Sequence, residues 1–223
     1  MCGRFVMTLP NDALARLFAA APDNDLPEGP NYNICPTARV HVVRAGAGGR
    51  RLSALRWGFL PSWSKGPTDG PPLINARAET IAEKPAFREA ARARRCLVPA
   101  DGFYEWTMAG GARQPWYIRR RGGAVLVMAG LWQGWVGAAG EVLETCAIVT
   151  CAANASIARL HHRMPVILEP EDWPLWLGEA GHGAARLMRP AAESVLELWP
   201  VTPRVNSNRA SGPDLIAPWS AQS

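Results

Sequence analysis

The sequence has few metal-ligating side chains, and none of them follows the spacing of a metal site. Its five cysteines, an odd number, include no Cys-x-x-Cys pair, and its four histidines do not recur at zinc-ligand spacing. This pattern argues against a disulfide framework and against structural zinc, so we predict no metal and no cofactor. Free thiols persist in reducing compartments, which makes the cytoplasm the expected location.

Long apolar runs are also missing. The longest stretch, around Ala124–Trp132, is about half the length that crosses a bilayer. The segment Met1–Val6 shows no basic region followed by a long apolar core, as a secretory signal would. We therefore expect no membrane contact. A composition of 48% hydrophobic and 19% charged residues is that of an ordinary globular protein.

Lysine is nearly absent. Lys65 and Lys84 are the only lysines among 24 basic residues, and the rest are arginines. The net charge of +5 favours an anionic partner, and the planar guanidinium suits bidentate contacts with phosphate. The chain is also rich in alanine and glycine, as GC-rich genomes encourage, and codon usage explains most of the arginines equally well. Charge alone leaves the partner open.

Two segments have a clear helical pattern. In the first, Thr8 is the expected N-cap, Pro10 lies in the first turn, and the apolar face includes Leu14 and Leu17. The second is Glu83–Arg95, rich in alanine and arginine. Shorter helical candidates are Ala155–Leu160 and Glu169–Leu177.

Eight short segments have strand character, and glycine-rich turns separate many of them. They are Val40–Arg44, Leu52–Leu60, Cys96–Pro99, Phe103–Thr107, Trp116–Arg120, Ala124–Trp135, Glu144–Cys151 and Pro165–Leu168. Many short strands with a few helices indicate an α+β fold whose antiparallel sheet closes towards a barrel. No linker or repeat divides the chain, so we predict one domain over residues 1–223, with a flexible tail of a few C-terminal residues.

Cys2 offers unusual chemistry if Met1 is removed. A cysteine at the mature N-terminus carries an amine and a thiol on adjacent carbons. With an aldehyde, the amine forms an imine and the thiol then closes a five-membered thiazolidine. The reference pKa of an α-amine, about 7.7–8.0, leaves a neutral fraction near neutral pH. Many proteins begin Met-Cys by chance, so this motif carries little weight alone.

Four ordered blocks accompany that N-terminus. They are Met1–Phe5 (MCGRF), Pro72–Thr80 (PLINARAET), Arg95–Trp106 (RCLVPADGFYEW) and His161–Pro165 (HHRMP). Together they strongly resemble the SOS-response-associated peptidase (SRAP) family of abasic-site processing proteins. The resemblance runs from residue 2 to beyond residue 200. Cys35 departs from it, because a small residue such as alanine is expected there.

The resemblance implies roles for four catalytic residues. Cys2 would be the nucleophile that crosslinks to DNA. Asn75 would orient the N-terminus or the sugar hydroxyls through its amide. Glu105 would transfer protons as the sugar opens and the imine forms, and His161 would act as acid or base at the ring oxygen or hydroxyl. Read without the resemblance, Glu105 would be an exposed strand carboxylate, Asn75 a cap and His161 a polar neighbour of the core.

The resemblance also implies a partner, single-stranded DNA that contains abasic sites. An SRAP-like protein would act as a monomer in the cytoplasm and be nucleoid-associated when bound to DNA. Three arginines near the catalytic positions would grip phosphates, two tryptophans would stack on bases, and one threonine would add a phosphate or sugar contact. These residues are Arg4, Arg77, Arg163, Trp63, Trp106 and Thr150. Core packing is the alternative for Trp106.

Other activities fit the same residues. The imine could lose the 3′ phosphate by β-elimination, which would be AP-lyase activity. A cysteine peptidase built from Cys2, His161 and Glu105 or Asn75 is a second possibility, whose most limited form is self-removal of Met1. A single-strand DNA-binding module without catalysis is the third.

Overall fold

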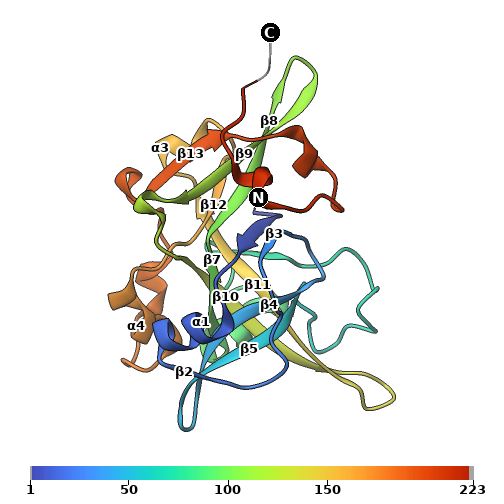
Figure 1. The fold of residues 1–223 in the computed structure, drawn as a ribbon. Helices are drawn as coiled ribbons and strands as arrows, with labels where there is room; N and C mark the ends of the chain where they lie inside the picture. Colours follow the sequence, from blue (N-terminus) through green and yellow to red (C-terminus); the bar gives the residue numbers. More distant parts are fainter. Residues whose placement is uncertain (1, 221–223) are drawn as a thin grey trace.

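The computed structural model describes residues 2–220, and five of its strands close into a barrel (Figure 1). Around the ring they are β11 (Val142–Ala152), β10 (Leu126–Val136), β7 (Arg95–Ala100), β4 (Arg39–Gly46) and β5 (Gly49–Trp57). Neighbours are antiparallel except β5 and β11, whose parallel pairing closes the barrel with Trp57 opposite Cys146. Closure removes the exposed edges that an open sheet would have.

Three short strands extend this barrel. They are β2 (Ala20–Pro22), parallel to β5; β12 (Arg163–Pro165), antiparallel to β11; and β6 (Asn75–Arg77), parallel to β11. Along β11, β6 begins where β5 ends, with Asn75 opposite Ile148. Residues 58–74 thus leave the barrel and return to the same edge of β11, where Asn75 faces the N-terminal segment.

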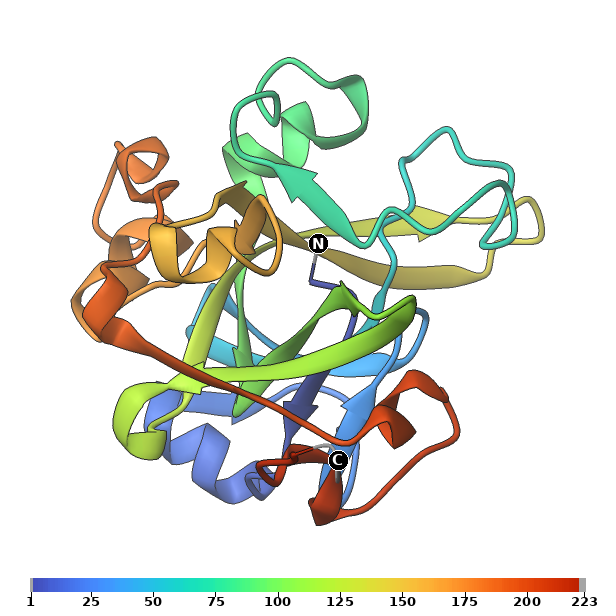
Figure 2. The ribbon, with the colours of Figure 1, turned by 90° about the horizontal axis from the view of Figure 1, so that it is seen from above.

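A second, five-stranded antiparallel sheet lies beside the barrel (Figure 2). Its order is β13 (Leu196–Pro200), β9 (Ala112–Arg120), β8 (Gly102–Ala109), β1 (Phe5–Met7) and β3 (Asn31–Ile34). At Gly102 a Cβ would lie 2.5 Å from the carbonyl oxygen of Ile118, so only glycine allows this approach of β8 to β9. This sheet brings β1 and β8 together, and with them the residues on either side of the candidate site.

Four α-helices pack around the strands. They are α1 (Asn11–Phe18), α2 (Pro85–Ala93), α3 (Ala155–Ala158) and α4 (Trp173–Leu177). Six short 3-10 helices complete the described chain: Arg121–Gly123, Pro170–Asp172, Ala184–Leu187, Glu193–Val195, Pro203–Asn206 and Pro213–Ile216. None of the helices between residues 2 and 220 combines the length and apolar character of a membrane span.

The first helix corrects one prediction. It begins at Asn11 with Pro10 as N-cap, and the expected cap Thr8 instead donates its hydroxyl to the Asp101 carboxylate at 2.5 Å. Leu14 is buried as expected, but Leu17 is 45% exposed. The Thr8 hydroxyl binds a residue that is distant in the sequence. A prediction based on local capping preferences does not account for such tertiary hydrogen bonds.

The α+β class and the barrel are confirmed. Each of the eight predicted strand segments contains or overlaps an observed strand, although Pro165–Leu168 overlaps β12 only at Pro165. Five strands were not predicted: β1, β2, β3, β6 and β13. Each has three to five residues, too few for an alternating pattern to stand out. The expected flexible tail falls partly on residues 221–223, outside the described residues.

Candidate active site

Cys2 lies in the main hydrophobic core although it is almost at the chain end. Its exposed fraction is 0%, and it precedes β1, which is itself buried along its whole length. Burial raises the pKa of the Cys2 thiol well above its usual value, and the charge of Glu105 raises it further. The thiol is therefore protonated at neutral pH, so it is not poised as a thiolate nucleophile.

Asn75 holds this segment from the barrel side. Its Nδ2 donates a hydrogen bond to the backbone oxygen of Cys2 at 3.0 Å. Its Oδ1 is buried and has no hydrogen-bond partner among residues 2–220. The structure thus brings Asn75 to Cys2, as predicted, and leaves an acceptor for a donor on the N-terminal residue or on a ligand. Asn75 is a strand residue, and the alternative of a helix cap is wrong.

Glu105 reaches the same region from β8. Only 3% of it is exposed, which contradicts the alternative of an exposed strand carboxylate. Burial raises the pKa of the Glu105 carboxyl above its usual value. A carboxyl with a raised pKa holds its proton more readily than an ordinary one, which suits it to proton transfer.

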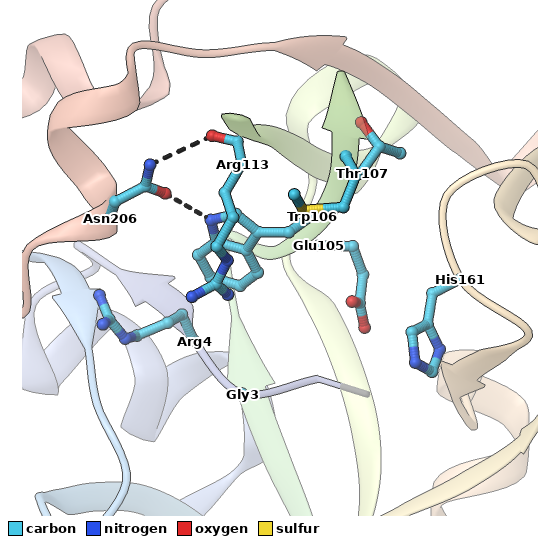
Figure 3. Close-up of a pocket in the computed structure, with 9 residues that line it drawn as sticks. Gly3, Arg4, Glu105, Trp106, Thr107, Arg113, His161 and Asn206 are labelled. Atoms are coloured by element: carbon cyan, nitrogen blue, oxygen red, sulfur yellow. Dashed lines mark hydrogen bonds between the residues drawn. The ribbon is translucent and has the colours of Figure 1, made fainter. Parts of the chain in front are cut away.

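His161 faces Glu105 across a cavity (Figure 3). The cavity measures about 400 Å³ and is lined by Gly3, Arg4, Glu105, Trp106, Thr107, Met108, Arg113, His161 and Asn206. His161 follows α3, and its backbone N–H donates to the oxygen of Ile157 at 3.0 Å. Burial, with contributions from neighbouring cations, lowers the pKa of the His161 imidazole. Glu105 and His161 therefore share one cavity, next to the segment that begins with Cys2.

The three predicted phosphate-binding arginines differ in exposure and partners. Arg77 is exposed at the end of β6, and Arg4 lines the cavity while donating to Asn33 Oδ1 at 2.7 Å. Arg163 is only 8% exposed, and its guanidinium binds both carboxylate oxygens of Glu79, at 2.7 and 2.8 Å. Arg163 is therefore a structural residue in this arrangement, and its predicted phosphate contact is corrected.

Thr150 belongs to the same buried group. It is fully buried in β11, and its backbone oxygen accepts from Arg163 at 2.7 Å. A side chain without exposure cannot touch a phosphate or sugar, so the prediction for Thr150 was wrong. Arg163 and Thr150 instead tie β12 to β11, which fixes the segment that carries His161.

The two tryptophans differ. Trp106 is half-buried at the cavity, and its Nε1 donates to Asn206 Oδ1 at 2.7 Å. The guanidinium carbons of Arg113 and Arg4 lie 5.3 and 6.0 Å from its ring centroid, as cation–π contacts. Trp63 is 62% exposed in the loop between β5 and β6 and lines another hollow, so the structure does not bring it to the site.

Arg113 and Asn206 were missed by the sequence reasoning. Arg113 is exposed on β9 beside the β8–β9 turn, and its backbone oxygen accepts from Asn206 Nδ2 at 3.1 Å. Asn206 is the last residue of the 3-10 helix Pro203–Asn206. The pairing of β8 with β9 was the one feature that could have pointed to Arg113 as a residue of the site. No feature of the sequence pointed to Asn206.

The remaining cysteines and acidic residues do not form a metal centre in the part of the chain that is described. All five cysteines are free. Between residues 2 and 220 no group of three or more His, Cys, Asp or Glu side chains is placed to hold a metal ion. The half-buried Cys35 donates to the backbone oxygen of Asn33 at 3.3 Å, outside the lining of the cavity.

Comparisons with known proteins place this geometry in a family. The profile of the SOS response associated peptidase (SRAP) family matches residues 1–208. The abasic site processing protein YoqW of Bacillus subtilis is 36% identical over 97% of this chain and 99% of its own length. YedK of Escherichia coli, with the same description, is 32% identical over 98% of this chain and 100% of its own.

Relatives extend to animals and to solved structures. The abasic site processing protein HMCES of Gallus gallus is 32% identical over 98% of this chain and 78% of its own length. A crystal structure of a Bacteroides thetaiotaomicron protein matches with a TM-score of 0.86 at 26% identity, covering 98% of this chain and 100% of that one. A phage-related protein from Bordetella bronchiseptica matches with a TM-score of 0.71 at 31% identity, over 94% and 99% of the two chains. This chain belongs to the SOS response associated peptidase (SRAP) family.

Proposed function

We propose that this protein processes abasic sites in single-stranded DNA by capturing the sugar aldehyde covalently through the amine and thiol of Cys2. The observation that carries the proposal is the convergence of four side chains: Asn75 binds the backbone of Cys2, and Glu105 and His161 line the adjoining cavity. Relatives that match nearly the full chain are named abasic site processing proteins. Removal of Met1, which lies outside the described residues, is part of the proposal.

The chemistry balances without a cofactor. The neutral amine of Cys2 adds to C1′ of the open sugar, and loss of one water gives an imine. The S–H of the thiol then adds across the C=N bond, sulfur to carbon and hydrogen to nitrogen, which closes the thiazolidine. The net change is one water lost. The imine could instead lose the 3′ phosphate by β-elimination, so strand cleavage competes with ring closure.

Glu105 and His161 have complementary tasks. An abasic sugar is mostly a closed hemiacetal, and its opening needs a proton at the ring oxygen and the removal of one from the C1′ hydroxyl. His161 would serve the ring oxygen, and Glu105 would take the hydroxyl proton and return it as water leaves. Their positions on opposite sides of one cavity support this division (Figure 3).

DNA binding would depend on charge near the cavity mouth. Arg4 and Arg77 keep the role predicted for them, and Arg113 joins them because it is exposed beside the same cavity. Cation–π contact with Trp106 would hold Arg113 ready for a phosphate. We expect the protein to act as a monomer in the cytoplasm, at the nucleoid when bound to DNA.

A general cysteine peptidase is less well supported. Acyl transfer by cysteine needs a thiolate, and both burial and Glu105 raise the pKa of the Cys2 thiol. Cleavage limited to the Met1–Cys2 bond stays compatible with the proposal, because Asn75 binds the backbone of Cys2.

Intact-mass measurement tests the proposal. Mixed with an oligonucleotide that carries one abasic site, the protein should give a species equal to the chain without Met1, plus DNA, less one water. Cys2→Ser should lose this stable adduct yet still be trapped by borohydride as a reduced imine. Cys35→Ser, a half-buried thiol outside the cavity lining, is the matched control and should react normally. A full yield of adduct from Cys2→Ser without borohydride would refute the proposal.

A further inference from the structure

His162 is exposed, and its ring stacks on that of His161. The two ring centroids are 4.3 Å apart and the planes differ by 26°. The backbone oxygen of His162 accepts from the N–H of Ala153 at 3.1 Å. The stack is the one interaction recorded for its side chain among residues 2–220. The mechanism proposed above uses His161 and gives His162 no task.

A backbone hydrogen bond sets the tautomer of His161. The N–H of Arg163 donates to Nδ1 of His161 at 2.9 Å, and the backbone oxygen of Arg163 lies farther from the same nitrogen, at 3.4 Å. The shorter contact favours the neutral ring whose proton resides on Nε2, the nitrogen on the far side of the ring. A proton on Nδ1 would face the Arg163 N–H and could be shared only with the more distant oxygen.

The charged groups around His161 come from several segments. The N-terminal segment contributes Arg4, β8 contributes Glu105 and β9 contributes Arg113, all around the same cavity. From its own segment His161 faces His162 and Arg163. The charge of Arg163 is largely offset because Glu79 binds its guanidinium.

We propose that His162 is a positioning residue for His161: its stacked ring holds the His161 imidazole in the orientation in which Nδ1 accepts from the Arg163 N–H and Nε2 carries the proton. The consequence for capture of the abasic sugar rests on the proposed function. A fixed Nε2–H can donate to the sugar ring oxygen, whereas a ring that turns away from this orientation cannot.

Nitrogen NMR of the histidine side chains tests this without DNA. With four histidines in the chain, ¹⁵N shifts report the tautomer of each ring. The wild type should show His161 as the Nε2–H form. His162→Phe keeps a stacked ring and should keep this tautomer. His162→Ala removes the stack and should give a mixture of the two tautomers.

Crosslinking rates supply the second readout. At pH 7, His162→Ala should react several-fold more slowly, and His162→Phe should remain within about twofold of the wild type. His182→Phe is the matched control, because exposed His182 lines a different hollow, and it should change neither readout.

The inference is overturned if wild-type His161 carries its proton on Nδ1, if His162→Ala leaves the His161 tautomer unchanged, or if His182→Phe changes it equally. Absence of any adduct with abasic DNA would refute the proposed function alone, since the NMR result is independent of it.

Discussion

The ion pair between Arg163 and Glu79 leads to a quantitative prediction. In Arg163→Met, the methionine side chain replaces the apolar stem of the arginine, and the guanidinium is lost. The backbone oxygen of buried Thr150 then loses a charged donor at 2.7 Å, at a cost of roughly 1.5–3 kcal/mol. The pair with Glu79 adds only about 0–1 kcal/mol, because the Glu79 side chain is 51% exposed and regains water. We expect a loss of about 2–3 kcal/mol in the free energy of unfolding.

The pH dependence distinguishes the two contributions. Arg163 holds the pKa of the Glu79 carboxyl below its usual value. A group whose pKa is lower in the folded state adds stability above its unfolded pKa, about 4.3, and this stability disappears as the pH falls through the folded pKa. The small loss in Glu79→Gln should therefore be visible at pH 7 and vanish in acid, while the Thr150 contribution persists.

Urea unfolding at pH 7 and in acid, combined with DNA titrations, provides the assay. The interpretation fails if Arg163→Met unfolds like the wild type and instead binds DNA more weakly with a reduced salt dependence. That outcome would mean that the guanidinium leaves Glu79 in solution to contact phosphate, as the sequence alone suggested. Arg77→Met is the matched control, an exposed arginine on the neighbouring strand β6, and should leave stability within about 0.5 kcal/mol of the wild type.

Three further outcomes are expected. Glu105→Gln should slow crosslinking at least about tenfold with DNA affinity unchanged. Because burial raises the pKa of the Glu105 carboxyl on folding, its contribution to wild-type stability is full below the unfolded pKa, about 4.3, and is lost as the pH rises through the folded pKa; urea unfolding should therefore show this variant gaining stability relative to the wild type at pH 7 and not in acid below the unfolded pKa. Arg77→Ala should weaken single-strand binding in fluorescence titrations and reduce the slope of log K against log salt by about 0.7. An unchanged slope would mean that Arg77 does not contact phosphate. Asn75→Ala removes the donor to the Cys2 backbone oxygen, and should slow crosslinking about tenfold in gel assays without lowering DNA affinity; wild-type rates would exclude a positioning role.

The sequence predicted the barrel because its strands are long enough to show a pattern. β10 and β11 have eleven residues each, and their apolar character and glycine-rich turns identify them without a template. β6 has three residues, and its place on β11 follows from closure of the barrel at Trp57 rather than from local sequence. The strand that positions Asn75 therefore could not be predicted from composition or periodicity.

The candidate site residues were predicted from their motifs, but their environments were not. Glu105 looks like a surface carboxylate in an alternating strand, and only the second sheet and the N-terminal segment bury it. Arg163 looks like a phosphate ligand because arginine rarely lies in a core, but Glu79 is 84 residues away in the chain and no local rule pairs them. Long-range partners decide which charged residues reach solvent.

Burial of Cys2 sets the order of events in the proposed capture. A thiol held protonated by burial is a poor first nucleophile, whereas the amine needs only to lose its own proton. Once the imine exists, the same S–H adds across the C=N bond and delivers its hydrogen to the nitrogen, so no thiolate has to be exposed to solvent. Burial that would disable a cysteine peptidase thus costs little in ring closure. An increase of crosslinking rate with pH that follows the amine, with no second rise from thiol ionisation, is the kinetic signature expected of this order.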